Sequence, residues 1–322
     1  MLFRILPVMV WSFTGSLVGT GLAMFAGNEI SWLAFLLVLT ISALIQGYPT
    51  HIINEIYDWR SGADRREPHG QKSGGSKVLQ AKLLTIREMW QAFFVSHVIL
   101  VILLSACTLV INSQIVYAFI IPGYLCGLLY SLPPFRFSYR PFLGEWLGGF
   151  AGIFLLVLGS YYAQSLTVNS FSVLIAFGMG LTYIGIMTFF HYLDFEHDQL
   201  ATPVKKTTVV SLGLNGSRKY AYLCLLFSVS VFLFYIFKFG IQGLPLLLLA
   251  LAVLISHNRT DLKNALSIIK WGKIITFSTL LAGIVFAAFS DPILAVMILP
   301  IIGGFWAHKK FGKLTVIQLS AS

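Results

Sequence analysis

The stretch MWQAFFVSHVILVILLSACTLVI, residues 89–111, contains no acidic side chain, no lysine and no arginine. A run of this kind is long enough to cross the hydrocarbon core of a bilayer as a helix, which takes about 20 residues. Similar runs fill most of the chain, which is 57% hydrophobic and only 11% charged. The sequence therefore predicts an all-α, polytopic membrane protein.

Apolar runs between charged or Pro/Gly-rich breaks predict a bundle of nine or ten transmembrane helices. They lie at residues 5–26, 31–57, 87–112, 114–131, 142–164, 170–193, 219–238, 241–257, 271–289 and 291–307. No polar stretch between these runs is long enough to bury a core of its own. We therefore expect residues 1–322 to form a single integral-membrane domain.

The net charge of +10 follows from topology. If the N-terminus is cytoplasmic, the basic segments 60–87, 205–219 and 259–273 all face the cytoplasm, and among the lysines and arginines only Lys238 faces outward. The basic tail after residue 307 lies inside only if the last run crosses, which favours ten spans. We expect a multi-pass protein of the cell membrane and no nucleic-acid partner.

Two acidic clusters stand out in this apolar chain: NEIYDWRSGAD at residues 54–64 and HYLDFEHD at residues 191–198. Together they contain half of the 12 acidic residues. They end the second and sixth predicted spans, so both face the cytoplasm. Acidic side chains at membrane depth are costly and usually mark a functional site.

The spacing within each cluster indicates how its side chains are used. Asn54 and Asp58 are four residues apart, as are Asp194 and Asp198, so each pair shares one face of a helix. Gly62 offers a break that would return Asp64 to the same site. Oxygen-only clusters suit Mg²⁺, which is usually completed by substrate phosphate oxygens. The alternative is that these acids form ordinary ion pairs beside the membrane.

Basic residues near both clusters are candidates for binding the oxygens of a diphosphate. They are Lys72 and Lys77, on either side of Gly74 and Gly75, and Lys205 and Lys206 after the second cluster. His191 shares the face of Asp194 and Asp198, but an interior hydrogen bond suits it better than a hard cation.

The paired clusters resemble the acidic motifs of the UbiA superfamily of intramembrane prenyltransferases, which follow the second and sixth helices. The segments GGSKVL at 74–79, YSLPPFRFSYRPFLGE at 130–145 and LGSYYAQ at 158–164 are most similar to those of 1,4-dihydroxy-2-naphthoate polyprenyltransferases. Two positions depart from the family pattern: Glu55 replaces a common Asp, and Val204 precedes the lysines where a Gly is often found.

This resemblance implies a helical bundle around a cavity open to lipid, with both motifs at its cytoplasmic mouth. Asn54, Asp58, Asp64, Asp194 and Asp198 are then the catalytic, Mg²⁺-binding residues. The resemblance further implies that a polyprenyl diphosphate loses its diphosphate and that an aromatic acceptor, 1,4-dihydroxy-2-naphthoate for menaquinone synthesis, attacks the allylic carbocation. The candidates for contacting the acceptor or the carbocation are Tyr57, Arg136, Tyr139, Arg140 and Tyr192.

Alternative functions remain within and outside this family. The same fold acts on 4-hydroxybenzoate, homogentisate or glycerophosphate acceptors, or as a terpene cyclase. A cation-coupled transporter fits less well, because its acids would lie near the bilayer midplane in repeated halves.

Overall fold

The residues that the structure describes form helices and turns, with no β-strand among them. The computed structural model describes residues 4–64, 75–76 and 78–311. In chain order the helical segments are α1 (Ile5–Val8), η1 (Met9–Phe13), α2 (Thr14–Phe25), α3 (Trp32–Ile45), η2 (Gln46–Thr50), α4 (His51–Ser61), α5 (Ile86–Ile111), η3 (Gln114–Val116), α6 (Tyr117–Leu129), η4 (Phe137–Tyr139), η5 (Gly144–Phe150), α7 (Ala151–Ser165), α8 (Ser170–Leu200), α9 (Thr208–Phe239), η6 (Ile241–Gly243), α10 (Leu244–Arg259), α11 (Ala265–Ser290), η7 (Pro292–Met297) and α12 (Ile298–Phe311).

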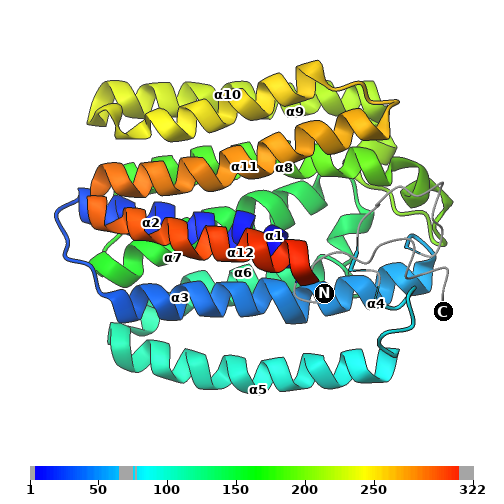
Figure 1. The fold of residues 1–322 in the computed structure, drawn as a ribbon, viewed down its shortest axis with the longest axis horizontal. Helices are drawn as coiled ribbons and strands as arrows, with labels where there is room; N and C mark the ends of the chain where they lie inside the picture. The colour runs from blue at the N-terminus through cyan, green and yellow to red at the C-terminus, as the bar shows by residue number, and fades with distance from the viewer. Residues whose placement is uncertain (1–3, 65–74, 77, 312–322) are drawn as a thin grey trace.

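Within this described part of the chain, nine helical rods are long and apolar enough to cross a membrane. A tenth, Gln114–Leu129, is shorter and contains Pro122. The expectation of an all-helical protein with nine or ten spans is thus confirmed. The long helices run along one common direction (Figure 1). Large apolar side chains such as Phe94 on α5 and Phe237 on α9 are exposed, as a lipid-facing surface requires.

The predicted helix ends are wrong at the second acidic cluster and after it. Residues 205–219 were expected as a loop, but α9 begins at Thr208, where the Thr207 side chain accepts a hydrogen bond from the Val210 N–H. Likewise α8 continues to Leu200 rather than ending at 193, and α11 begins at Ala265 rather than at 271. The reason is physical: hydropathy locates the bilayer, whereas a polar helix end can continue into water.

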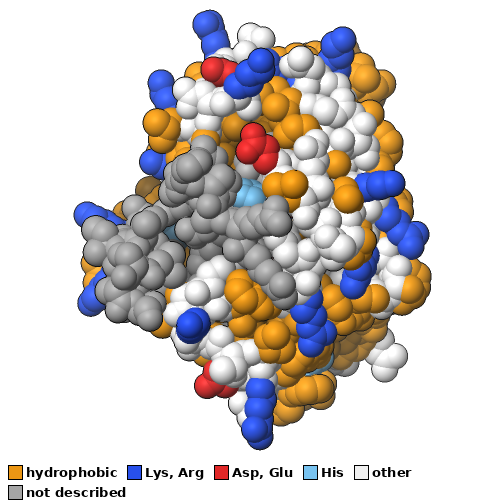
Figure 2. Space-filling view, turned by 90° about the vertical axis from the view of Figure 1, so that its right-hand side faces the viewer, with side chains coloured by type: hydrophobic (Ala, Val, Ile, Leu, Met, Phe, Trp, Pro, Cys, Tyr) orange, Lys and Arg blue, Asp and Glu red, His pale blue; other side chains and the backbone are white. Residues whose placement is uncertain are grey.

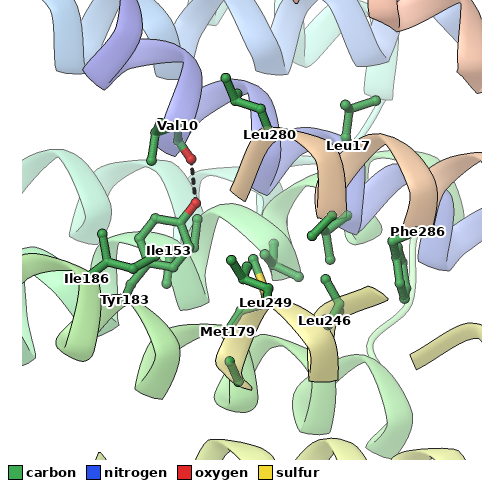
Figure 3. Close-up of a cluster of buried hydrophobic side chains, with 14 of the residues drawn as sticks. Val10, Leu17, Ile153, Met179, Tyr183, Ile186, Leu246, Leu249, Leu280 and Phe286 are labelled. Carbon is green, nitrogen blue, oxygen red and sulfur yellow. Dashed lines mark hydrogen bonds between the residues drawn. The ribbon is translucent and has the colours of Figure 1, made fainter. Parts of the chain in front are cut away.

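A large cluster of buried hydrophobic side chains joins the first span, made of α1, η1 and α2, to helices α7, α8, α10 and α11. Leu17, Met179 and Phe286 are fully buried in it. The Tyr183 hydroxyl donates a hydrogen bond to the Val10 carbonyl in the π-helical segment η1 (Figure 3). This bond satisfies the polar end of a side chain that is otherwise surrounded by apolar groups.

The second span changes its winding just before the first acidic cluster. Pro49 has no N–H to donate to the Ile45 carbonyl, so the helix widens into the π-helical segment η2. The Thr50 hydroxyl donates instead to the carbonyls of Ile45 and Gln46, at 3.0 Å each. The chain returns to α-helical geometry at His51, so that α4 carries the acidic cluster on a regular helix.

The turn between α8 and α9 packs against the end of α4. The Thr202 N–H donates to the Ser61 carbonyl at 2.8 Å. Figure 1 shows the end of α4 and this turn at the same end of the bundle. The fold therefore brings the two acidic clusters together, although they are more than a hundred residues apart in sequence.

Candidate functional site

The first acidic cluster is ordered by contacts along α4. The Asn54 amide nitrogen donates to Asp58 Oδ2 and to Ser131 Oγ, both at 2.9 Å. The first of these contacts is the one that the four-residue spacing predicts. The second fixes the cluster to the segment that follows α6.

Asp64 returns to the cluster because α4 ends at a glycine. Gly62 has a φ of 82°, in the left-handed region that glycine adopts without strain. The Asp64 N–H then donates to the Asp58 carbonyl at 3.3 Å. Gly75 lies beside the returning chain, and a Cβ placed there would be 2.8 Å from Asp64 Oδ2 and 3.3 Å from Glu55 Oε1.

Lys205 connects the two acidic clusters. Its ammonium nitrogen lies 2.9 Å from Asp58 Oδ2 and 3.6 Å from Asp198 Oδ1. All three side chains are buried. The Lys205 N–H also donates to the Asp198 carbonyl at 3.0 Å, which holds the turn against α8. A cation therefore lies between the acids of α4 and those of α8.

The electrostatics of this region show an excess of negative charge. Burial, together with the charges of Asp58 and Glu55, raises the pKa of Asp64 to about 8. Burial alone would lower the pKa of Lys205, but the charges of Asp198 and Asp58 outweigh it and hold the pKa well above its usual value. Among the described residues, Lys205 is thus shared between carboxylates of both clusters.

Aromatic and basic side chains surround Asp58. The Tyr139 hydroxyl donates to Asp58 Oδ1 at 3.1 Å and to Ser61 Oγ at 2.8 Å. The Arg136 guanidinium lies 5.5 Å from the ring centre of Tyr57 and 5.4 Å from that of Tyr139. Buried Arg136 Nε has no hydrogen-bond partner among the described residues. The predicted residues Tyr57, Arg136 and Tyr139 therefore lie together beside the acids.

Other predicted site residues are placed differently. Lys206 and Arg140 are exposed, and Arg140 donates to the Pro134 carbonyl at 3.2 Å. The Tyr192 hydroxyl pairs with His257 Nδ1 of α10 at 3.0 Å, on another side of α8 from the acids. Asp194 is half-buried on α8. Lys72 and Lys77 lie outside the described residues.

Sequence reasoning missed two groups at this site. Ser131, which accepts from Asn54, is a polar side chain in an aromatic and Pro-rich segment and gave no distinct signal. Glu145 is buried at the start of η5 and forms a 3.1 Å contact with His191 Nδ1. An isolated acid inside a predicted span was the available signal for Glu145.

The donors of this site suit a hard divalent cation. Asp198 Oδ2 is buried and has no hydrogen-bond partner in the described structure. The neighbouring oxygen donors are carboxylates and an amide, the ligand types that Mg²⁺ takes. Within the described ranges, no three His, Cys, Asp or Glu side chains already form a metal-binding group. Lys205 provides the positive charge between Asp58 and Asp198 in this arrangement.

These features define a class of protein: a polytopic helical membrane protein with a buried, acid-rich polar site at one end of its bundle. The model of the UbiA prenyltransferase family matches residues 12–274. Since this match covers most of the chain, the protein belongs to the UbiA prenyltransferase family.

Relatives and solved structures agree with this assignment. The chain is 30% identical over 208 residues to 1,4-dihydroxy-2-naphthoate octaprenyltransferase of Bacillus subtilis (strain 168), a match that covers 64% of this chain and 63% of that protein. It is 27% identical over 256 residues to the Escherichia coli (strain K12) protein of the same name, covering 77% and 80%. The chain thus spans less than two thirds of the length of the Bacillus relative.

The same fold is found in a UbiA homolog from Archaeoglobus fulgidus whose structure was solved bound to GPP and Mg²⁺. The two structures superimpose with a TM-score of 0.64 over 89% of this chain and 99% of that one, at 18% sequence identity. At this identity the likeness concerns the fold.

Proposed function

We propose that this protein is a Mg²⁺-dependent prenyltransferase that transfers a polyprenyl group from polyprenyl diphosphate to an aromatic acceptor in the membrane. The observation that carries the proposal is the position of Lys205 between Asp58 and Asp198. An anion-binding cation between two sets of carboxylates is the arrangement that a metal-bound diphosphate requires.

Oxygen ligands for Mg²⁺ would come from both motifs, namely Asn54, Asp58, Asp64, Asp194 and Asp198. When bound, Mg²⁺ would neutralise the diphosphate and favour its departure. Lys205 would turn from the carboxylates to the diphosphate oxygens, and the exposed Lys206 would add charge at the water-facing side. We propose the same role for Lys72 and Lys77.

The aromatic residues beside Asp58 suit the organic half of the reaction. Tyr57 and Tyr139 offer ring faces that stabilise a developing carbocation, and the hydrogen bond to Asp58 fixes the Tyr139 ring. Arg136, whose Nε has no partner among the residues that the structure describes, would hold an acceptor carboxylate. Their packing around a buried site would also exclude water, which otherwise quenches the cation.

We further propose that the acceptor is 1,4-dihydroxy-2-naphthoate and that the product serves menaquinone synthesis. The support comes from the two relatives named as octaprenyltransferases of this acceptor. The excess of basic residues at the end of the bundle that carries the motifs supports a cytoplasmic site in the cell membrane.

A product assay by mass spectrometry tests this proposal. Purified protein receives Mg²⁺, a polyprenyl diphosphate, and 1,4-dihydroxy-2-naphthoate in competition with 4-hydroxybenzoate. We expect demethylmenaquinone as the Mg²⁺-dependent product, and a loss of about 100-fold or more in Asp58→Ala and Asp194→Ala, since each removes a carboxylate that acts on the transition state. Both variants should remain folded in detergent.

Other results of the product assay would change different parts of the proposal. Prenylated hydroxybenzoate would retain the reaction and change the acceptor. Near-normal turnover in either variant would contradict the assignment of the acidic residues. If neither aromatic acceptor reacts, glycerophosphate acceptors, cyclised terpenes and finally ion flux in liposomes are measured next.

A further inference from the structure

A second polar network lies beside the acids and has no part in the function described so far. His191 Nδ1 is 3.1 Å from Glu145 Oε1, and the Thr208 hydroxyl donates to Glu145 Oε2 at 2.6 Å. On the other side of the imidazole, Nε2 lies 3.3 Å from the Tyr130 hydroxyl. A carboxylate, an imidazole and a phenol therefore form a continuous chain.

The backbone around Glu145 shapes this network. Glu145 lies in η5, a π-helical segment of the kind often found at functional sites. The Tyr130 ring packs on Gly148 of the same segment, where a Cβ would lie 2.8 Å from the ring. The Phe142 N–H donates to the Thr208 hydroxyl at 2.7 Å and so orients that hydroxyl toward Glu145.

Burial within the network differs among its members. Glu145, His191 and Thr208 are buried, whereas Tyr130 is half-buried. The phenol is also the terminal member of the chain Glu145, His191, Tyr130, so a molecule in the neighbouring site would join the network at the Tyr130 hydroxyl. Tyr130 also directly precedes Ser131, which accepts a hydrogen bond from Asn54 in the first acidic cluster.

The depth of His191 matches the place where the new bond would form. His191, Asp194 and Asp198 share one face of α8, and at 1.5 Å per residue His191 lies roughly 4.5 Å deeper than Asp194 along the helix axis. A diphosphate held at the carboxylates would place the first carbon of its prenyl chain, and the attacking ring, on this deeper side.

The hydrogen bonds also decide which imidazole nitrogen can accept a proton. With the Glu145 carboxylate facing Nδ1, the neutral ring carries its proton on Nδ1, and the lone pair of Nε2 faces Tyr130. A carboxylate that orients an imidazole in this way also stabilises the imidazolium once it forms.

We propose that Tyr130, His191 and Glu145 form a proton relay for a hydroxylated aromatic acceptor, an inference that rests on the proposed function. The Tyr130 hydroxyl takes the proton of the acceptor hydroxyl while giving its own to His191 Nε2, and Glu145 positions and balances the imidazolium. Removal of this proton makes the ring a stronger nucleophile.

The step balances in atoms and charge. The carbon–oxygen bond of the prenyl diphosphate breaks and its electron pair leaves with the diphosphate, while the ring forms the new carbon–carbon bond. The group that the prenyl chain replaces then leaves as the ring regains aromaticity: a ring proton passes to the released diphosphate, or a ring carboxylate leaves as carbon dioxide and its bonding electrons stay in the ring. His191 returns its proton through Tyr130 to the acceptor oxygen.

Two variants test the relay. His191→Asn keeps an amide that can donate to Glu145 but has no Nε2, and Tyr130→Phe removes only the hydroxyl. Each should lower kcat by about 100-fold, within the range for loss of a proton-transfer group, with little change in the KM for the prenyl diphosphate. The second variant keeps the test valid if the first does not fold.

Acceptor acidity separates a relay from a structural role. Across acceptors with progressively more acidic hydroxyls, the ratio of wild-type to variant kcat should fall, because an ionised hydroxyl needs no relay. The control is His257→Asn, which alters another buried histidine, one that pairs with Tyr192, about 200° around α8 from Asp194. It should retain wild-type kcat.

Unchanged kcat in both variants, or a ratio that stays constant across the acceptors, would overturn the relay while leaving the prenyltransferase assignment intact. A wild-type protein that yields no product with any hydroxylated aromatic acceptor would overturn the proposed function, and the relay with it.

Discussion

At the scale of single residues, the site depends on one carboxylate more than on any other. Asp58 accepts hydrogen bonds from Asn54, Tyr139 and Lys205, which come from α4, η4 and the turn before α9. Hydrogen bonds to a charged acceptor are stronger than neutral ones. Asp58 thus links three segments that are far apart in sequence.

The two consecutive lysines provide a matched pair for a prediction. Lys205→Ala removes the buried cation between Asp58 and Asp198 and leaves their charges unpaired, which costs about 3–5 kcal/mol for a buried pair. We expect a lower melting temperature in EDTA, partly restored by Mg²⁺. Lys206→Ala, at an exposed position, should keep the wild-type melting temperature and raise the KM for the diphosphate more than that for the acceptor.

Thermal unfolding in detergent and steady-state kinetics measure both effects. Equal melting temperatures for the two variants would contradict a bridging role for Lys205. Equal KM changes for both substrates in Lys206→Ala would contradict its diphosphate role.

The sequence predicted part of this residue-level arrangement. Four-residue spacing was enough to pair Asn54 with Asp58, because helix geometry fixes that contact. The spacing could not predict that Lys205 is buried and Lys206 exposed, because packing alone decides the directions of adjacent side chains in a turn. Tyr192 is two residues from Asp194, about 200° around the helix. The helical period therefore could have predicted that Tyr192 points away from the acids.

At the scale of elements, the site is made by interruptions of helices. Pro49 widens the second span before α4, Gly62 ends α4, and Gly75 lies against the returning chain. Each interruption brings polar groups to the site that a continuous helix would place elsewhere. The acidic cluster therefore depends on backbone conformations as well as on its carboxylates.

Two glycines with positive φ test this dependence. Gly75→Ala adds strain at a φ of 80° and places a Cβ 2.8 Å from Asp64 Oδ2, whereas Gly27→Ala adds similar strain at a φ of 88° with nothing within 4 Å. Each should lose about 1–2 kcal/mol of stability from the backbone alone. Only Gly75→Ala should also raise the Mg²⁺ concentration needed for half-maximal activity, because it displaces Asp64.

Mg²⁺ titrations of both variants measure this difference. If Gly75→Ala and the wild type need the same Mg²⁺ concentration for half-maximal activity, the position of Asp64 seen in the structure is not required for Mg²⁺ binding.

Helix positions were predictable because a run of about 20 apolar residues identifies a membrane span without knowledge of the helices packed against it. Helix ends were less predictable. At α9, Thr207 caps the helix at its start and Gly213 breaks it with a φ of 69°, and neither feature alters mean hydropathy.

At the scale of the whole molecule, basic side chains surround the same end of the helical bundle that holds the candidate site. Figure 2, which faces the end of the bundle where α4 ends, shows Lys and Arg side chains spread around that face and few acidic ones. Positive residues favour the cytoplasmic side. Asp58, Asp64 and Asp198 of the site are buried, and Asp194 is half-buried.

Cysteine labelling tests the orientation. In a background with Cys107, Cys126 and Cys224 replaced, we expect Lys263→Cys to react with an impermeant maleimide only in inside-out vesicles, because the turn between α10 and α11 lies at the site's end. Glu29→Cys, in the turn between α2 and α3, should react only in right-side-out vesicles. Both positions are exposed. The reverse pattern would place the site outside.

Calorimetric titration of the purified protein with geranyl diphosphate tests the claim that the two acidic motifs together bind a diphosphate through Mg²⁺. We predict saturable binding that requires Mg²⁺, disappears in EDTA, and is lost in both Asp58→Asn and Asp198→Asn, one substitution in each motif. Equal affinity without Mg²⁺, or wild-type affinity in either variant, would contradict the claim.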